Sequence, residues 1–96
     1  MKPYDVVLLQ IAEADYFDGI VRYGDRFEHS VDEALDLLSK FPELGPVFLR
    51  NHRRLIIRRI NFAIYYTLTG QRVMVGGILH LRQNPKRIRE RLKKLG

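Results

Sequence analysis

The chain has no cysteine and no long hydrophobic run. Without cysteine it cannot form disulfides, bind a metal through thiolates or use a thiol as a nucleophile, and this composition suits a reducing cytoplasm. No stretch approaches the roughly 18 apolar residues that a membrane-spanning helix needs. The amino-terminal apolar run, Val6 to Leu9, is too short for the apolar region of a signal peptide, so we expect a cytoplasmic protein with no membrane partner.

Acidic residues are scarce in the second half of the chain. Residues 50–96 hold 13 Lys or Arg and one acid, Glu90, whereas residues 1–49 hold 4 Lys or Arg and 10 Asp or Glu. The two halves therefore carry formal charges of +12 and −6. This split predicts two oppositely charged surfaces with different partners, although a solvated surface that happens to be sorted by sequence would give the same count.

Signals for metal or nucleotide binding are also missing. His29, His52 and His80 are far apart and lack the spacing that zinc sites use. No glycine-rich phosphate-binding loop precedes a helix. We therefore expect no metal site and no cofactor.

The segment from residue 53 to residue 82 is rich in β-forming residues. We predict three strands in it, at about Arg54–Arg59, Phe62–Leu68 and Arg72–Leu81, because Val, Ile, Tyr and Phe favour a pleated, half-buried surface. Gly70 supplies the positive φ of a tight hairpin. Both faces of the middle strand are apolar or aromatic, so protein should cover both faces of the sheet.

The flanking segments predict a fourth strand and three helices. Residues 4–9 form a short β-branched strand, and apolar residues at helical spacing predict a helix over residues 11–23 that ends at Gly24. A second helix begins at Asp25 or Ser30 and ends before Pro42, and residues 47–51 form a loop. Asn84 caps a final basic helix, with Pro85 at its first position.

This order predicts one α+β domain over residues 1–96, with the elements strand, two helices, three strands and a terminal helix. The two neighbouring helices should form an antiparallel hairpin across the sheet. Their exposed side carries most of the acids: Glu13, Asp15, Asp18, Asp25, Glu28, Asp32, Glu33 and Asp36. The Gly76-Gly77 pair predicts a bulge or a close backbone approach in the last strand.

The order of elements and three segments resemble the RelE/ParE superfamily of type II toxin–antitoxin toxins. Phe41–Phe48 resembles the superfamily's turn after the second helix, Arg53–Leu68 its arginine-rich strand followed by an aromatic strand, and Ile78–Arg87 its closing segment. The resemblance spans roughly residues 4–88 and implies an antiparallel sheet packed by a helical hairpin, with a carboxyl-terminal basic helix. Gln83-Asn84 departs from the Arg-Asp that is common in the superfamily.

The resemblance implies one of two activities. ParE-like toxins poison DNA gyrase by binding, whereas RelE-like toxins are endoribonucleases that cleave mRNA on the ribosome. Cleavage through the 2′-OH needs a proton acceptor, a group that stabilises the phosphate charge and an acid for the leaving oxygen. The candidates for a catalytic role are Arg58, Arg59, His80 and Arg82.

This catalytic set is incomplete, which favours the ParE-like branch. The stretch between Leu44 and Arg89 has no acid, and the three strands have no lysine. Tyr65 and Tyr66 are alternative proton carriers, but their mid-strand positions are more typical of core residues. His80 also occurs in the ParE-like pattern, so it does not discriminate between the branches, and we favour a structural role for it over a catalytic one.

A toxin that acts by binding needs a cationic face. The candidate target-binding residues are Arg53, Arg54, Arg58, Arg59, Arg82, Lys86 and Arg87. Alternation along the strand puts Arg54 and Arg58 on one side of the sheet and Arg53 and Arg59 on the other, and some of them can pair with the helical acids. Two further hypotheses are a small basic nucleic-acid-binding module and a terminal helix lying on anionic lipid, the second disfavoured by that helix's thin apolar stripe.

The resemblance also implies a partner, a ParD-like antitoxin that wraps the toxin in a hetero-oligomer. We expect it to cover the helical hairpin and part of the sheet, with Tyr16, Asp32 and Asp36 as antitoxin-binding residues. A segment that crosses these acidic helices should carry basic or apolar residues. The antitoxin's identity and the choice between gyrase and the ribosome are left open by the sequence.

Overall fold

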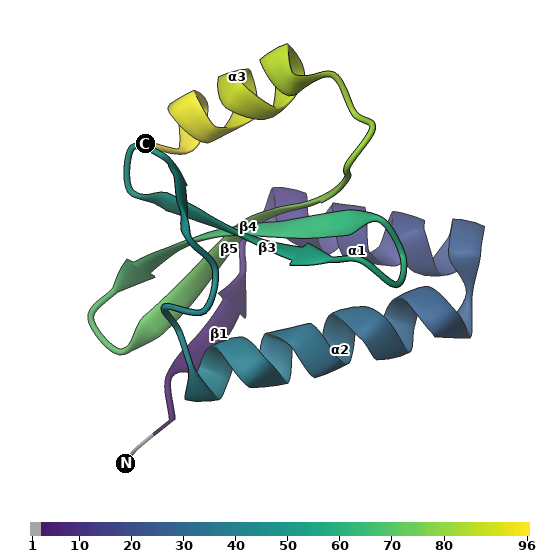
Figure 1. The fold of residues 1–96 in the computed structure, drawn as a ribbon, viewed down its shortest axis with the longest axis horizontal. Helices are drawn as coiled ribbons and strands as arrows, with labels where there is room; N and C mark the ends of the chain where they lie inside the picture. Colours follow the sequence, from purple (N-terminus) through teal and green to yellow (C-terminus); the bar gives the residue numbers. More distant parts are fainter. Residues whose placement is uncertain (1–2) are drawn as a thin grey trace.

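A five-stranded sheet separates two hydrophobic cores, with a helical hairpin on one face and a single helix on the other (Figure 1). The computed structural model describes residues 3–96. In chain order the elements are β1 (Asp5–Leu8), α1 (Gln10–Tyr23), α2 (Asp25–Lys40), β2 (Val47–Leu49), β3 (His52–Ile57), β4 (Phe62–Thr69), β5 (Arg72–His80) and α3 (Pro85–Leu95). The predicted α+β fold and the order of its helices are confirmed.

The sheet has the strand order β1-β5-β4-β3-β2. Four of its strands pair antiparallel, but β1 pairs with β5 in parallel, so the expectation of an antiparallel sheet is wrong for this pair. A parallel pair needs a long crossover, which the whole chain between β1 and β5 provides. Alternation of side chains identifies strands but does not say which strand lies next to which.

Two strand boundaries also differ from the prediction. Val47–Leu49, expected to be part of a loop, pairs with β3 as a three-residue edge strand, which is too short to show a period in the sequence. β3 ends at Ile57, so Arg58 and Arg59 lie in the β3–β4 turn and not at the end of a strand. Asn61 closes this turn with a φ of 58°, a conformation that asparagine tolerates better than most residues.

The side chains of β4 alternate between the two cores, as predicted. Ile64 and Tyr66 are fully buried beneath α1 and α2, together with Phe27 of α2. Ala63 and Tyr65 face the opposite way and pack with Leu79, Ile88 and Leu92, the last two from α3. Each face of the sheet is therefore covered by protein.

Two glycines allow close approaches between layers. A Cβ on Gly19 of α1 would lie 2.1 Å from the ring of Phe27, and one on Gly76 of β5 would lie 2.6 Å from Leu95 of α3. The register of β5 against β4 also shifts opposite Gly76, so both the bulge and the close approach predicted here are present. The predicted helix starts are confirmed for α3 but not for α2. Asn84 caps α3 by accepting from the Lys86 N–H, whereas the N-cap of α2 is Gly24 and not Asp25 or Ser30.

Candidate functional site

Three connections meet at the end of the sheet where β3 and β5 finish. The β3–β4 turn is joined to the segment after β5 by a hydrogen bond from the Leu81 N–H to the Asn61 carbonyl (2.8 Å). It is joined to the start of α2 by a hydrogen bond from Arg26 Nη2 to the Arg59 carbonyl (3.1 Å). The joint between α1 and α2 therefore lies against the same end of the sheet.

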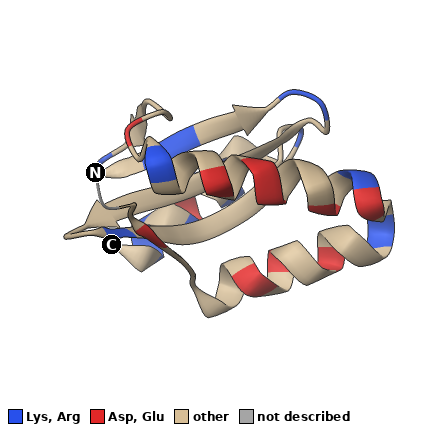
Figure 2. Cartoon of the chain, turned by 90° about the horizontal axis from the view of Figure 1, so that it is seen from below, with Lys and Arg blue, Asp and Glu red and all other residues tan. Residues whose placement is uncertain are grey.

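This arrangement gathers positive charge from both halves of the sequence. We define the cationic end as Arg22, Arg26, Arg58, Arg59 and Arg82. Figure 2 shows Lys and Arg at the joint of the helical hairpin and in the neighbouring β-turn. Arg22 and Arg26 belong to the acidic half of the sequence, so only the fold reveals that they belong to this surface.

The arginines of the cationic end are exposed and weakly paired. Arg59 Nη1 lies 3.7 Å from Glu33 Oε1, and Arg22 Nε lies 3.1 Å from Asp18 Oδ2, with all four side chains more than half exposed. Exposed pairs of this kind contribute about 0–1 kcal/mol. Arg58 and Arg82 are exposed and form no ion pair with any residue in 3–96. These guanidinium groups are available to a partner.

Arg53 and Arg54 lie away from the cationic end, on opposite faces of the sheet. Arg53 Nη1 donates to the Gly45 carbonyl (2.9 Å) and to the Glu43 carbonyl (3.3 Å). The Arg54 guanidinium lies 4.4 Å from the centre of the Phe48 ring, on the α3 side. The predicted alternation of this pair is therefore present, and both side chains stabilise neighbouring loops and strands.

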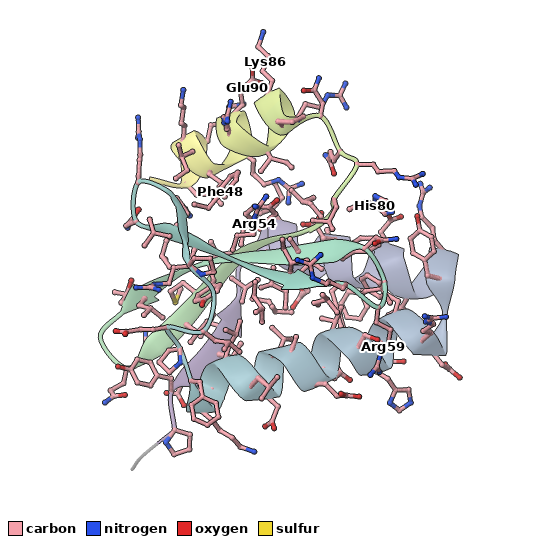
Figure 3. All side chains as sticks on the ribbon, in the orientation of Figure 1. Phe48, Arg54, Arg59, His80, Lys86 and Glu90 are labelled. Atoms are coloured by element: carbon pink, nitrogen blue, oxygen red, sulfur yellow. The ribbon has the colours of Figure 1, made fainter. Side chains whose placement is uncertain are left out.

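Lys86 and Arg87 are exposed in the first turn of α3. Figure 3 shows Lys86 projecting outward from α3, whereas Arg59 and His80 lie at the end of the sheet. The seven predicted target-binding residues thus do not form one surface. Arg58, Arg59 and Arg82 lie at the cationic end, and the α3 residues form a separate basic area.

His80 is half-buried beside the cationic end. Its ring packs edge-on against Phe62, with centroids 5.1 Å apart, and its Nδ1 accepts a hydrogen bond from the Arg82 N–H (3.0 Å). This hydrogen bond occupies Nδ1, and the ring orders the segment after β5. The structural role that the sequence allowed for His80 is present in the fold.

Tyr65 and Tyr66 are buried in the two cores. The Tyr66 hydroxyl donates to the Pro42 carbonyl (2.8 Å) and accepts from the Gly45 N–H (2.9 Å). Burial raises the pKa of both phenols above 10, partly offset by Arg54 beside Tyr65 and by the Gly45 N–H at Tyr66. Neither hydroxyl is placed to exchange protons with an external substrate.

A groove of about 550 Å³ separates the edge strand β1 from α2 on another side of the molecule. Its lining includes Asp5, Asp32 and Asp36 and the apolar side chains of Val6 and Leu35. The outer edge of β1 has no strand partner in the described sheet. The groove therefore combines free backbone groups, apolar surface and negative charge.

Tyr16, the third predicted antitoxin-binding residue, lies on α1 and contacts the same acidic surface. Its hydroxyl donates to Asp32 Oδ1 (2.7 Å), and burial together with this carboxylate raises the pKa of Tyr16 to about 12. Asp36 forms an exposed pair with Lys40 (3.1 Å). The structure thus places Tyr16, Asp32 and Asp36 together.

Comparison with known proteins identifies the family. Over residues 6–85 the sequence matches the family described as the ParE toxin of the type II toxin–antitoxin system parDE. The chain belongs to the ParE toxin family. It is therefore the toxin component of a type II toxin–antitoxin system, as its resemblance to the RelE/ParE superfamily implied.

A solved structure described as "Chromosomal ParDE TA system from P. aeruginosa" has a similar fold. It superposes on this ParE-family toxin with a TM-score of 0.67 and 17% sequence identity, covering 85% of this chain and 100% of that chain. At this identity the likeness concerns the fold. A search among curated protein sequences found no match.

Residues 3–96 of the toxin contain neither a metal-binding cluster nor a membrane-spanning helix. No three His, Asp or Glu side chains lie close enough together to hold a metal ion. No helix in this range is both long and apolar enough to cross a bilayer.

Sequence reasoning missed several residues whose roles depend on how the elements pack. Tyr23 and Arg26 lie at the cationic end, although the sequence predicted only that they belong to helices. Asp15 and Arg91 form a mostly buried ion pair between residues 76 positions apart. No local pattern signals contacts of this kind, since they depend on which sheet end each helix reaches.

Proposed function

We propose that this toxin inhibits DNA gyrase by binding, and that the cationic end makes the decisive contact. The observation that carries this proposal is the gathering of Arg58, Arg59 and Arg82 at one end of the sheet, exposed and nearly free of ion pairs. Guanidinium groups form bidentate hydrogen bonds with carboxylates and phosphates, the groups that a gyrase–DNA complex presents. Binding of this kind needs no proton transfer.

The same geometry argues against RNA cleavage. A nuclease requires a group free to take the 2′-OH proton, and the tyrosine candidates are buried while His80 Nδ1 accepts a backbone hydrogen bond. The phosphate-stabilising arginines are present, but arginine stays protonated and does not act as the base. The toxin therefore has the charge for binding without a complete acid–base pair beside it.

A ParD-like antitoxin is the proposed neutralising partner, and the groove between β1 and α2 is its proposed site. The free edge of β1 offers backbone groups to an extended segment, while Asp5, Asp32 and Asp36 favour Lys or Arg on that segment. In the cytoplasm, where we place the protein, this contact would form a toxin–antitoxin hetero-oligomer. The groove and the cationic end are separate surfaces.

The target is tested with purified toxin in two parallel assays. We expect inhibition of gyrase-catalysed supercoiling of plasmid DNA and no codon-linked cleavage of mRNA on translating ribosomes. The double variant His80→Ala/Arg82→Ala discriminates further, because a nuclease would lose cleavage whereas a binder keeps part of its toxicity through Arg58 and Arg59. Ribosome-dependent cleavage by the wild-type toxin, without gyrase inhibition, would contradict the proposal.

The antitoxin site is tested by charge reversal. Asp32→Lys/Asp36→Lys should weaken binding of the cognate antitoxin at least about tenfold, because two attractive contacts become repulsive. A matched control, Glu43→Lys/Glu90→Lys, makes the same change in net charge at exposed positions outside the groove. Isothermal titration calorimetry measures both affinities. Equal losses in the two variants would show that net charge, and not the groove, governs binding.

A further inference from the structure

A hollow of about 210 Å³ lies within the cationic end and has a composition suited to a flat anionic ligand. It is lined by Tyr23, Arg26, Phe27, Arg59, Ile60 and Phe62. Four of these residues are aromatic or aliphatic, and the other two are arginines. No carboxylate belongs to this lining.

Tyr23 is the exposed aromatic wall of this hollow. Its side chain is 55% exposed, yet its ring is held by an edge-on contact with Phe62 (centroids 5.6 Å apart) and by Phe27 (6.2 Å). A ring fixed from behind and open in front costs little conformational entropy when a second ring stacks on it. The same ring also borders the hollow that contains His80, so it stands between two depressions.

The charges around the hollow favour an anion. The Arg26 side chain donates to the Arg59 carbonyl, which fixes the start of α2 relative to the β3–β4 turn. Within residues 3–96, Arg59 pairs only with Glu33, at 3.7 Å and largely exposed, which offsets little of its charge. Arg58 precedes Arg59 in the same turn and adds an unpaired positive charge.

From these observations we infer that the hollow binds an unpaired nucleotide of single-stranded DNA. The base stacks on Tyr23, and flanking phosphates contact Arg26, Arg58 and Arg59, a combination of aromatic platform and cationic track that suits single strands. The lining has no carboxylate or side-chain amide, the strong acceptors that would favour a 2′-OH, so we assign the strand as DNA. This inference adds a DNA contact to the proposed gyrase inhibition. It rests on that proposal only in assuming that the toxin meets single-stranded DNA at gyrase.

Base stacking is tested with a fluorescent reporter, because the chain has no tryptophan. The variant Tyr23→Trp should show quenched tryptophan fluorescence when a single-stranded oligothymidylate is added at low salt. The control Phe17→Trp places the same fluorophore at a 57% exposed position of α1 outside both hollows, and it should not be quenched. Absence of quenching in Tyr23→Trp, or equal quenching in both variants, overturns the inference.

The phosphate contacts are tested by fluorescence anisotropy with a labelled oligothymidylate and no gyrase. The wild-type affinity should fall with salt at a log–log slope of about −2, as expected for three phosphates on a single strand, and Arg59→Gln should reduce the slope by about 0.7. Arg72→Gln, an exposed arginine at the other end of β5, should leave the slope unchanged. Tyr23→Ala should weaken binding at least about fivefold, whereas Tyr23→Phe keeps it.

Two comparisons decide between this inference and its alternatives. Tighter binding of oligouridylate or of duplex DNA than of single-stranded DNA overturns it. Because the binding assay contains no gyrase, a toxin that inhibits gyrase but does not bind oligothymidylate overturns this inference and leaves the proposed function standing. Circular dichroism melts of each variant show whether a lost affinity comes from unfolding.

Discussion

Replacement of Asp15 should destabilise the toxin more than any other change of a single charged residue in the helical hairpin. The Asp15 carboxylate, on α1, accepts hydrogen bonds from the Ile78 N–H of β5 (3.0 Å) and from both terminal nitrogens of Arg91 on α3. The pairing of β1 with β5 ends at Val75, so β1 offers no acceptor to the Ile78 N–H, and the Asp15 carboxylate accepts it instead. One side chain thus connects helices that lie on opposite faces of the sheet.

The magnitude follows from burial and from the groups left unpaired. The Asp15 side chain is 15% exposed and the Arg91 side chain 21%. Breaking a buried ion pair by removing one partner costs about 3–5 kcal/mol, and an unpaired backbone N–H costs about 1–3 kcal/mol. Arg91 can turn partly toward water, so we expect about 3 kcal/mol for Asp15→Ala. Asp15→Asn keeps an acceptor for Ile78 and should cost about half as much.

Urea unfolding followed by circular dichroism measures these free energies. For a chain of this size, about 3 kcal/mol corresponds to a fall in Tm of at least about 12 °C. The control Asp18→Ala breaks an exposed pair with Arg22 and should change the free energy of unfolding by less than about 0.5 kcal/mol. The double variant Asp15→Ala/Arg91→Leu should recover stability by removing the unpaired charge. A cost below about 1 kcal/mol for Asp15→Ala would refute this reasoning.

Three further changes have expected outcomes. Burial lowers the pKa of His52 below 6.5; the nearby Arg50 charge adds to this, and the Leu92 backbone partly offsets it although neither ring nitrogen of His52 has a hydrogen-bond partner among residues 3–96. The unfolded chain therefore binds the His52 proton more tightly than the folded chain does, so the free energy of unfolding falls as pH drops below about 6.5. His52→Leu should flatten this fall in urea titrations. Gly19→Ala should lower Tm although alanine has the better helix propensity, because the added Cβ would clash with the Phe27 ring. In a Phe27→Leu background, Gly19→Ala should lower Tm by less. Tyr66→Phe should cost about 1–3 kcal/mol in thermal unfolding by leaving the Gly45 N–H unpaired; no loss would contradict the assigned hydrogen bond.

The local elements of the fold were predictable because each depends on neighbouring residues. Apolar and aromatic residues on both faces of β4 predicted two covered faces, and Asn84 with Pro85 predicted the start of α3. The Gly76-Gly77 pair predicted a close approach in β5, but not that the approaching side chain is Leu95 of α3. The β3–β4 turn was predicted too short, with Arg58 and Arg59 in the strand, because it contains no glycine or proline and Asn61 was its one local signal.

The candidate site was less predictable, because it depends on long-range packing. Charge counting found that the arginines matter but grouped them by sequence, which joined Arg53 and Arg54 to a surface that they do not share. The parallel docking of β1 and the return of the helical hairpin place Arg26 beside the β3–β4 turn and Arg22 beside the end of β5. Information of this kind lies in the topology and not in any local period.

The central claim is that the cationic end contacts gyrase, and supercoiling inhibition by charge-neutralised toxin tests it most directly. Arg58→Gln/Arg59→Gln removes two charges from the cationic end, whereas Arg53→Gln/Arg72→Gln removes two from other parts of the sheet. We predict that the first variant needs at least about tenfold more toxin for half-maximal inhibition, while the second, matched for stability by circular dichroism, stays within about twofold of wild type. Equal potency of the two folded variants would contradict the claim.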